Sequence, residues 1–199
     1  MNRILLLTIL AAAPAFGQWH HFGEARATGF FGVGATAPVN PTGRITDTGW
    51  NFAGGIGVTK NYVGLMVDFS FNDLGLNDST LRQFGATRGS EKFWSLTVDP
   101  VFHVNQRGPV DFYVTGGGGL YSRISTLRAP SGFGGPFNGA DEVVSSLTRY
   151  KPGVDGGAGF SFNVGYTNRV KVFLEARYHH MFTPGPGESF VPVTVGVRF

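Results

Sequence analysis

The 199-residue sequence has no cysteine, few charged side chains and no apolar run long enough for a membrane-spanning helix. Without cysteine, no disulfide can stabilise the chain, so an exported protein of this size would depend on a well-closed fold. Charged residues make up 15% of the chain and 31 residues are glycine, too little charge and too much glycine for an ordinary soluble surface. The net charge of +3 comes from interspersed residues without a basic run, so no nucleic-acid partner is expected. If the chain enters a membrane, it must do so as strands.

The N-terminal residues have the pattern of an export signal. Arg3 gives a short basic start, residues 4–13 are almost wholly apolar, and small residues allow cleavage after Ala15 or Gly17. The apolar run is much shorter than the roughly 20 residues that a spanning helix needs. We therefore expect a signal peptide over residues 1–17 and one domain over residues 18–199.

Alternation of apolar and small or polar residues is the main signal in the rest of the chain. In residues 190–199, the valines and Phe199 share one face, whereas Thr194, Gly196 and Arg198 share the other. Runs of about ten such residues are the length that a tilted transmembrane strand requires. Similar runs, some diluted by glycine, cover residues 23–34, 50–59, 62–72, 94–103, 110–123, 154–164 and 170–179. The pattern predicts about eight strands.

The connections between these runs alternate in length. Residues 60–61, 105–109 and 165–168 read as tight turns, whereas residues 35–47, 73–91, 126–152 and 183–189 read as longer loops. Short periplasmic turns and long extracellular loops are typical of outer-membrane barrels. The sequence thus predicts an all-β fold, an antiparallel up-and-down transmembrane β-barrel of about eight strands.

Alternation alone does not say which face is inside, so a soluble barrel or sandwich is the competing interpretation. Its wetted strand face would carry bulky polar residues, yet the polar face here holds many glycines, which weaken an exposed strand. Glycines fit a narrow lumen, where small residues must alternate with large ones. Trp50, Trp94, Tyr178 and Phe199 lie near strand ends, where aromatic girdles sit. We predict a mutually neutralising lumen network of Glu24, Arg26, Asp68, Asp99, Asp155, Glu175, Arg177 and Arg198.

The last two strands carry a family resemblance. The segments Val172-Phe173-Leu174-Glu175-Ala176-Arg177-Tyr178-His179 and Phe190-Val191-Pro192-Val193-Thr194-Val195-Gly196-Val197-Arg198-Phe199 resemble the closing hairpin of the small OmpA- and OmpX-type outer-membrane β-barrels. The resemblance implies a bacterial outer-membrane location and contact with outer-membrane lipids and lipopolysaccharide. It also implies insertion by the barrel assembly machinery, with Phe199 as the assembly signal. We expect a monomer without the peptidoglycan-binding domain of the full OmpA type.

Candidate catalytic and metal-binding residues are few. The pair His179-His180, ahead of Glu188 and Ser189, is similar to residues of barrel enzymes that deacylate lipid A, but neighbouring strand residues point to opposite faces. No hydroxyl is expected within reach of an activating histidine. We expect one histidine in the lumen and the other at the membrane interface, and neither a cofactor nor a metal ion.

The function predicted from these observations is a non-enzymatic integral outer-membrane barrel with a filled lumen and a role in envelope structure or surface interaction. One alternative is binding or transport of a small hydrophobic molecule, with Phe30, Met66, Phe93, Phe173 and the loop phenylalanines lining a pocket at the extracellular mouth. A lipid-A-modifying enzyme is the other. The loop over residues 126–152, with Phe133 and Phe137, is a further candidate binding surface.

Overall fold

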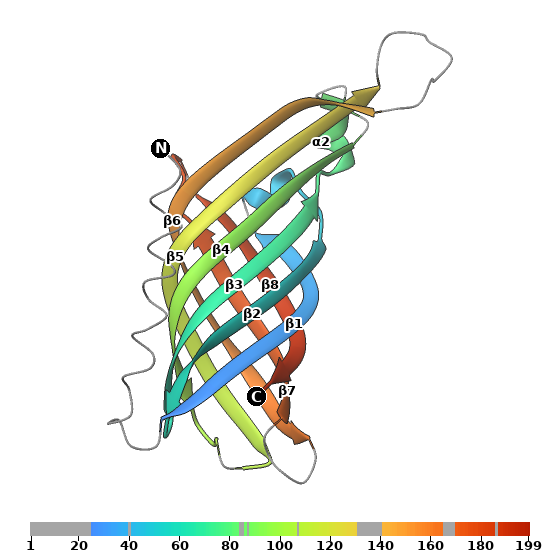
Figure 1. The fold of residues 1–199 in the computed structure, drawn as a ribbon. Helices are drawn as coiled ribbons and strands as arrows, with labels where there is room; N and C mark the ends of the chain where they lie inside the picture. Colours follow the sequence, from blue (N-terminus) through green and yellow to red (C-terminus); the bar gives the residue numbers. More distant parts are fainter. Residues whose placement is uncertain are drawn as a thin grey trace.

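The protein is a closed eight-stranded antiparallel barrel (Figure 1). The computed structural model describes residues 25–39, 41–83, 86, 88–106, 108–130, 141–164, 170–185 and 187–199. Each strand pairs with its neighbours in sequence, and β1 pairs with β8 to close the ring. The strands are β1 (Arg26–Val39), β2 (Gly49–Lys60), β3 (Val63–Gly75), β4 (Arg88–His103), β5 (Val110–Pro130), β6 (Asp141–Val164), β7 (Val170–Met181) and β8 (Glu188–Arg198). The predicted fold class is confirmed.

Two short helices lie in the connections between strands. The 3-10 helix η2 (Thr42–Arg44) follows β1, and the α-helix α2 (Asp78–Gln83) follows β3. Within the described ranges, no helix has the length and apolar character needed to cross a membrane.

The strand faces divide the residues as their alternation predicts. Along β3, Leu65 and Val67 are exposed on the outside of the barrel, whereas Met66, Asp68 and Ser70 are buried inside it. Along β8, Val193, Val195 and Val197 are exposed, while Thr194 and Arg198 are buried. The barrel therefore presents a continuous apolar surface outward and a mostly polar surface inward.

Glycines in the lumen face bulky residues on the neighbouring strand. The registers pair Gly55 with Asp68, Gly157 with Arg177, Gly159 with Glu175, Gly117 with Asp155 and Gly196 with Phe173. A side chain at Gly117 would overlap the Val98 carbonyl oxygen and Oδ1 of Asp99. The small residues thus leave the narrow interior free for large and charged side chains.

The hairpin of β5 and β6 is longer than predicted. The segment predicted as a loop over residues 126–152 is strand as far as Pro130 and again from Asp141. Both strands extend past the others at the end of the barrel where α2 lies (Figure 1). The register between them shifts once, at Leu127 and Arg128. The predicted surface around Phe133 and Phe137 lies outside the described residues.

The lumen is filled in layers, which can be followed inward along β4. Glu91 lies at the mouth, Phe93 belongs to an upper apolar cluster, and Asp99 lies in a central polar network. Val101 belongs to a lower apolar cluster, and His103 bonds to Asp111 below it. The upper cluster is Leu74, Phe93, Tyr121, Met181 and Phe190; the lower cluster is Phe30, Met66, Val101, Tyr113 and Phe173.

The end of the chain completes the closure of the barrel. Phe199 and Gly29 exchange backbone hydrogen bonds of 2.9 Å in both directions, and the Thr28 hydroxyl donates to the Phe199 carbonyl oxygen at 3.0 Å. A Cβ atom at Gly29 would lie 2.9 Å from the Phe199 ring, so the ring covers this glycine. Phe199 therefore secures the seam between β1 and β8.

Candidate functional site

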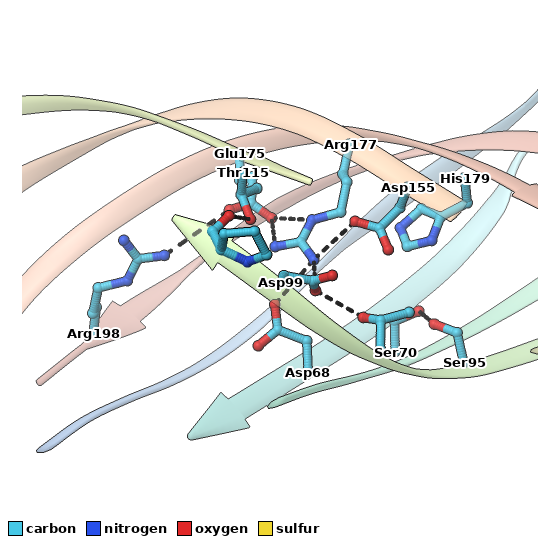
Figure 2. A network of polar contacts seen from close by, with 12 residues as sticks. Asp68, Ser70, Ser95, Asp99, Thr115, Asp155, Glu175, Arg177, His179 and Arg198 are labelled. Atoms are coloured by element: carbon cyan, nitrogen blue, oxygen red, sulfur yellow. Dashed lines mark hydrogen bonds and ion pairs between the residues drawn. The ribbon is translucent and has the colours of Figure 1, made fainter. Parts of the chain in front are cut away.

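The centre of the lumen is organised around one arginine. The Arg177 guanidinium donates from Nη1 to Asp99 Oδ2 at 2.8 Å and to Asp68 Oδ2 at 3.0 Å, and lies 3.5 Å from Asp155 Oδ1. Its Nε also donates to Glu175 Oε1 at 3.0 Å. Figure 2 shows the four carboxylates surrounding this side chain, which they approach from β3, β4, β6 and β7. Arg177 therefore links four strands across the barrel.

Two oxygens of this network have no hydrogen-bond partner among the described residues. They are Oδ1 of Asp68 and Oδ1 of Asp99, and both residues are buried. Each packs instead over a glycine of the adjacent strand, Gly55 for Asp68 and Gly117 for Asp99. The close glycine backbones cover these oxygens, so the carboxylates depend on Arg177 for compensation of their charge.

A second cation, Arg198, lies one layer below. Its guanidinium carbon is 4.3 Å from the centre of the Tyr113 ring, 5.4 Å from that of Phe173 and 5.8 Å from that of Phe30. Its Nη2 lies 3.9 Å from Glu175 Oε2. Stacking on aromatic faces and one carboxylate thus hold the penultimate residue of the chain inside the barrel.

Six of the eight residues predicted for the lumen network come together in these two layers. They are Asp68, Asp99, Asp155, Glu175, Arg177 and Arg198. Arg26 does not join them, because it is exposed at the first position of β1. Glu24 lies outside the described residues. Alternation correctly assigns Arg26 to the inward-facing set of β1 residues, but it gives no information about the position of a residue along the barrel axis.

Several polar residues of the network were not singled out from the sequence. The Tyr121 hydroxyl lies 2.9 Å from Nδ1 of His179 and donates to Asp155 Oδ2 at 3.2 Å. The Thr97 hydroxyl donates to Asp99 Oδ2 at 2.7 Å. The inward parity of these residues was readable from the sequence, but their partners lie on other strands.

A separate ion-pair cluster lies at the mouth. Arg123 donates to Glu91 from Nε at 2.6 Å and from Nη2 at 2.8 Å, and its Nη1 bonds to Glu188. The Ser125 hydroxyl lies 2.8 Å from both Glu91 oxygens. Glu91 and Glu188 fall in segments predicted as loops, so the sequence does not predict this cluster.

The mouth cluster lies beyond the level of the outward-facing Trp94, at the loop end of the strands. Burial raises the pKa of the Glu188 carboxyl, and the positive charge of Arg123 opposes this rise. The hydrogen bond to Glu91 raises the pKa of Arg123 above its usual range, so this guanidinium stays charged.

Two cavities among the described residues differ in size: the one inside the lumen is very small, and the one at the mouth is larger. The gap beside Arg177 and His179 has a volume of about 20 Å³, which is room for about one water molecule. A larger cavity of about 340 Å³ lies at the mouth, lined by η2, the mouth cluster and the connection between β7 and β8.

The apolar pocket predicted for a transport function is not formed as expected. Phe30, Met66 and Phe173 pack together in the buried lower cluster, on the far side of the Arg177 network from the mouth. Only Phe93 of the four predicted residues lines the mouth cavity. All four side chains point into the lumen, as their alternation predicts, but they lie at different depths along the barrel axis.

The prediction that no hydroxyl lies within reach of a histidine is wrong. The register of β7 with β8 places Ser189 opposite His180, so the Ser189 hydroxyl lies 2.8 Å from His180 Nδ1. The Tyr178 hydroxyl also donates to Ser189 Oγ at 2.7 Å. Ser189 is only 2% exposed, however, so no substrate carbonyl can approach its hydroxyl in this arrangement. His179 lies in the lumen and His180 on the opposite, outward face, as predicted.

No group of three or more His, Cys, Asp or Glu residues in the described part of the chain is arranged to hold a metal ion. The clustered carboxylates of the lumen face Arg177.

Comparison with known proteins agrees with the barrel architecture. No protein-family model and no curated protein matches the sequence. Among solved structures, a major outer membrane protein from Thermus thermophilus superposes with a TM-score of 0.63 at 10% identity, covering 88% of this chain and 98% of its own. Neisserial surface protein A superposes with a TM-score of 0.55 at 15% identity, covering 87% of this chain and 97% of its own. The chain therefore has the fold of the small outer-membrane β-barrel proteins, as its closing hairpin suggested.

Proposed function

We propose that this protein is an integral protein of the bacterial outer membrane whose lumen is closed by its own side chains. Its role is structural within the envelope, or one of interaction at the cell surface, and it is not enzymatic. The observation that carries this proposal is the combination of an apolar outer surface with a charged, filled interior.

The outer surface is the first support. Apolar side chains are exposed on every strand, among them Val33, Ile56, Val98, Leu174 and Val195. Soluble monomers rarely expose contiguous apolar patches above a few hundred Å². A band of this kind is stable when lipid is its solvent, and Trp50, Trp94, Tyr150 and Tyr178 give it an aromatic border.

The filled interior is the second support. Arg177 and its carboxylates span the barrel, and apolar clusters lie above and below them. The mouth cluster of Glu91, Arg123 and Glu188 adds another layer. An ion would have to displace several layers of packed side chains to pass.

Electrical recording after insertion into planar lipid bilayers tests this proposal. We expect no stable single-channel currents from the refolded protein. The folded state is checked on a denaturing gel, where the unboiled barrel should migrate differently from the boiled chain. Stable, sizeable currents from gel-verified protein would contradict the closed lumen, and loss of the migration difference would contradict the membrane barrel.

The partners proposed for this function are outer-membrane lipids, lipopolysaccharide and, during insertion, the barrel assembly machinery. Residues 1–17 are proposed to be the cleaved export signal. The position of Phe199 at the seam of β1 and β8 supports its proposed role as assembly signal. We propose that the inserted protein is a monomer.

A further inference from the structure

The cavity at the mouth of the barrel, called here the mouth cavity, has features of a binding site that the closed lumen does not require. Its volume of about 340 Å³ is within the range of small-molecule sites. It lies inside the ring of strands, above Phe93, and the connections β1–β2 and β7–β8 form its walls. A ligand would therefore enter from the aqueous side and not from the lipid.

One cation of the mouth cavity is available to an anionic group. Arg123 is already paired with Glu91 and Glu188, and Arg149 adds a further positive charge near Glu188. Arg44 also lines the cavity, and no described residue accepts a hydrogen bond from its side chain or pairs with its charge. The two arginines and two glutamates that line the cavity balance in charge, and Arg44 is the cation among them whose hydrogen-bond donors have no partner among the described residues.

The apolar lining favours a ligand with a hydrophobic body. Ile45 and Pro184 lie on two different connections, and the buried Phe93 ring contributes to the floor. A flat or short-chain apolar group can lie between these side chains while its anionic end faces Arg44. A fully hydrated inorganic anion would leave this surface unused.

The segment that carries Arg44 and Ile45 is held in place before any ligand binds. The Asn77 side chain donates to the Arg44 carbonyl oxygen at 2.9 Å, and the Asn77 backbone donates to the Ile45 carbonyl oxygen at 3.0 Å. The Ser189 backbone donates to Thr42 Oγ1 at 3.0 Å, which ties η2 to β8. Little ordering of the chain is then required on binding.

We infer that the mouth cavity binds a small, water-soluble amphipathic anion, of the class of organic carboxylates with an aromatic or short aliphatic body. The Arg44 guanidinium binds the carboxylate, and Ile45, Phe93 and Pro184 contact the apolar part. This site goes beyond the proposed envelope function, because binding at the mouth requires no passage through the lumen.

Fluorine NMR titration with para-fluorobenzoate tests the inference, using protein refolded in phospholipid nanodiscs and empty nanodiscs as the baseline. We expect saturable binding that weakens about tenfold or more in Arg44→Gln, since the lost interaction is charge-assisted. Arg82→Gln, which removes an exposed cation from α2 on the neighbouring connection, is the matched control and should bind like the parent protein. Thr183→Trp should abolish binding by filling the cavity.

Three results would overturn the inference. The first is a signal no larger than that of empty nanodiscs, and the second is equal binding of para-fluorobenzoate by the parent protein and Arg44→Gln. The third is an affinity for para-fluorobenzylammonium, which has the same ring with the opposite charge, equal to that for para-fluorobenzoate. Each variant is first checked for the heat-dependent gel migration of the folded barrel. For the parent protein, absence of binding with a normal migration difference refutes only the mouth site, whereas absence of the migration difference refutes the membrane barrel itself.

Discussion

Arg177 is the residue on which the interior depends most. Four carboxylates surround it, and among the described residues the only other guanidinium in these two layers is that of Arg198. Removing one partner of a buried ion pair typically costs about 3–5 kcal/mol, because the other charge remains desolvated. We expect Arg177→Met to lower the free energy of unfolding, measured by urea titration in phospholipid vesicles, by about this amount.

Two further variants serve as comparisons for Arg177→Met in the same unfolding assay. Arg82→Met removes an exposed arginine of α2 and should change the free energy of unfolding by less than about 0.5 kcal/mol. Asp68→Asn removes one of the carboxylates that outnumber the guanidinium groups, so its cost should stay below about 1 kcal/mol. Equal stability of Arg177→Met and Arg82→Met would show that the network does not hold the barrel together.

Gly117 in the lumen and Gly156 on the outward face of β6 allow a second prediction at the residue scale. A Cβ atom at Gly117 would overlap the Val98 carbonyl oxygen, whereas the nearest neighbour of a Cβ at Gly156 is 3.9 Å away, at the Thr115 carbonyl oxygen. Forcing a methyl group into a packed interior costs about 1–3 kcal/mol. We expect Gly117→Ala to be destabilised by this amount and Gly156→Ala by less than about 0.5 kcal/mol in the same unfolding assay. Similar losses for both would mean that the two glycines matter for their backbone freedom and not for the space they leave.

At the scale of the element, the junction of β7 and β8 carries a hydrogen-bonded group on the outward face. Ser189 interacts with Tyr178 and His180 but is nearly inaccessible. We expect Ser189→Ala to reduce the free energy of unfolding by about 1 kcal/mol, the usual net value of buried hydrogen bonds. Mass spectrometry of lipid A from cells producing either protein should give the same acylation pattern. A pattern that changes with the parent protein but not with Ser189→Ala would reveal an enzyme and refute the structural role.

The strands also show what the sequence could and could not reveal. Alternation in β3, β7 and β8 was readable because one face meets apolar surroundings and the other meets a narrow polar lumen. In the outer half of β6, residues 146–150 are exposed on both faces. No alternation is imposed there, and the hairpin extension was therefore missed.

The sequence predicts which strand face carries each site residue, but it does not predict which residues of other strands that side chain contacts. The inward parity of Asp68 and Asp99 followed from the sequence, whereas their meeting at Arg177 depends on the tilt and register of four strands. The same limit explains Ser189, because its position opposite His180 is set by the pairing of β7 with β8.

At the scale of the whole molecule, the membrane proposal depends on the solvent that the outer surface meets. Val195 of β8 lies on this surface, 49% exposed, and pairs with Val33 at the middle of β1, whereas Val104 follows the end of β4 and is 65% exposed. Arginine on the lipid face of a barrel costs about 2–4 kcal/mol at the bilayer midplane and about 0–1 near the interface. In water, both positions would accept arginine at little cost, since surface substitutions usually stay within about 0.5 kcal/mol.

We therefore expect Val195→Arg to lower the free energy of unfolding in phospholipid vesicles by about 2–4 kcal/mol, and Val104→Arg by less than about 1 kcal/mol. The difference between the two variants is the informative quantity, because both add the same side chain at an exposed valine. It should persist at high salt, since the penalty arises from burying the charge in hydrocarbon and not from interaction with other surface charges. Two equally mild variants would mean that the outward valines meet water, and the lumen network would then belong to the core of a soluble barrel.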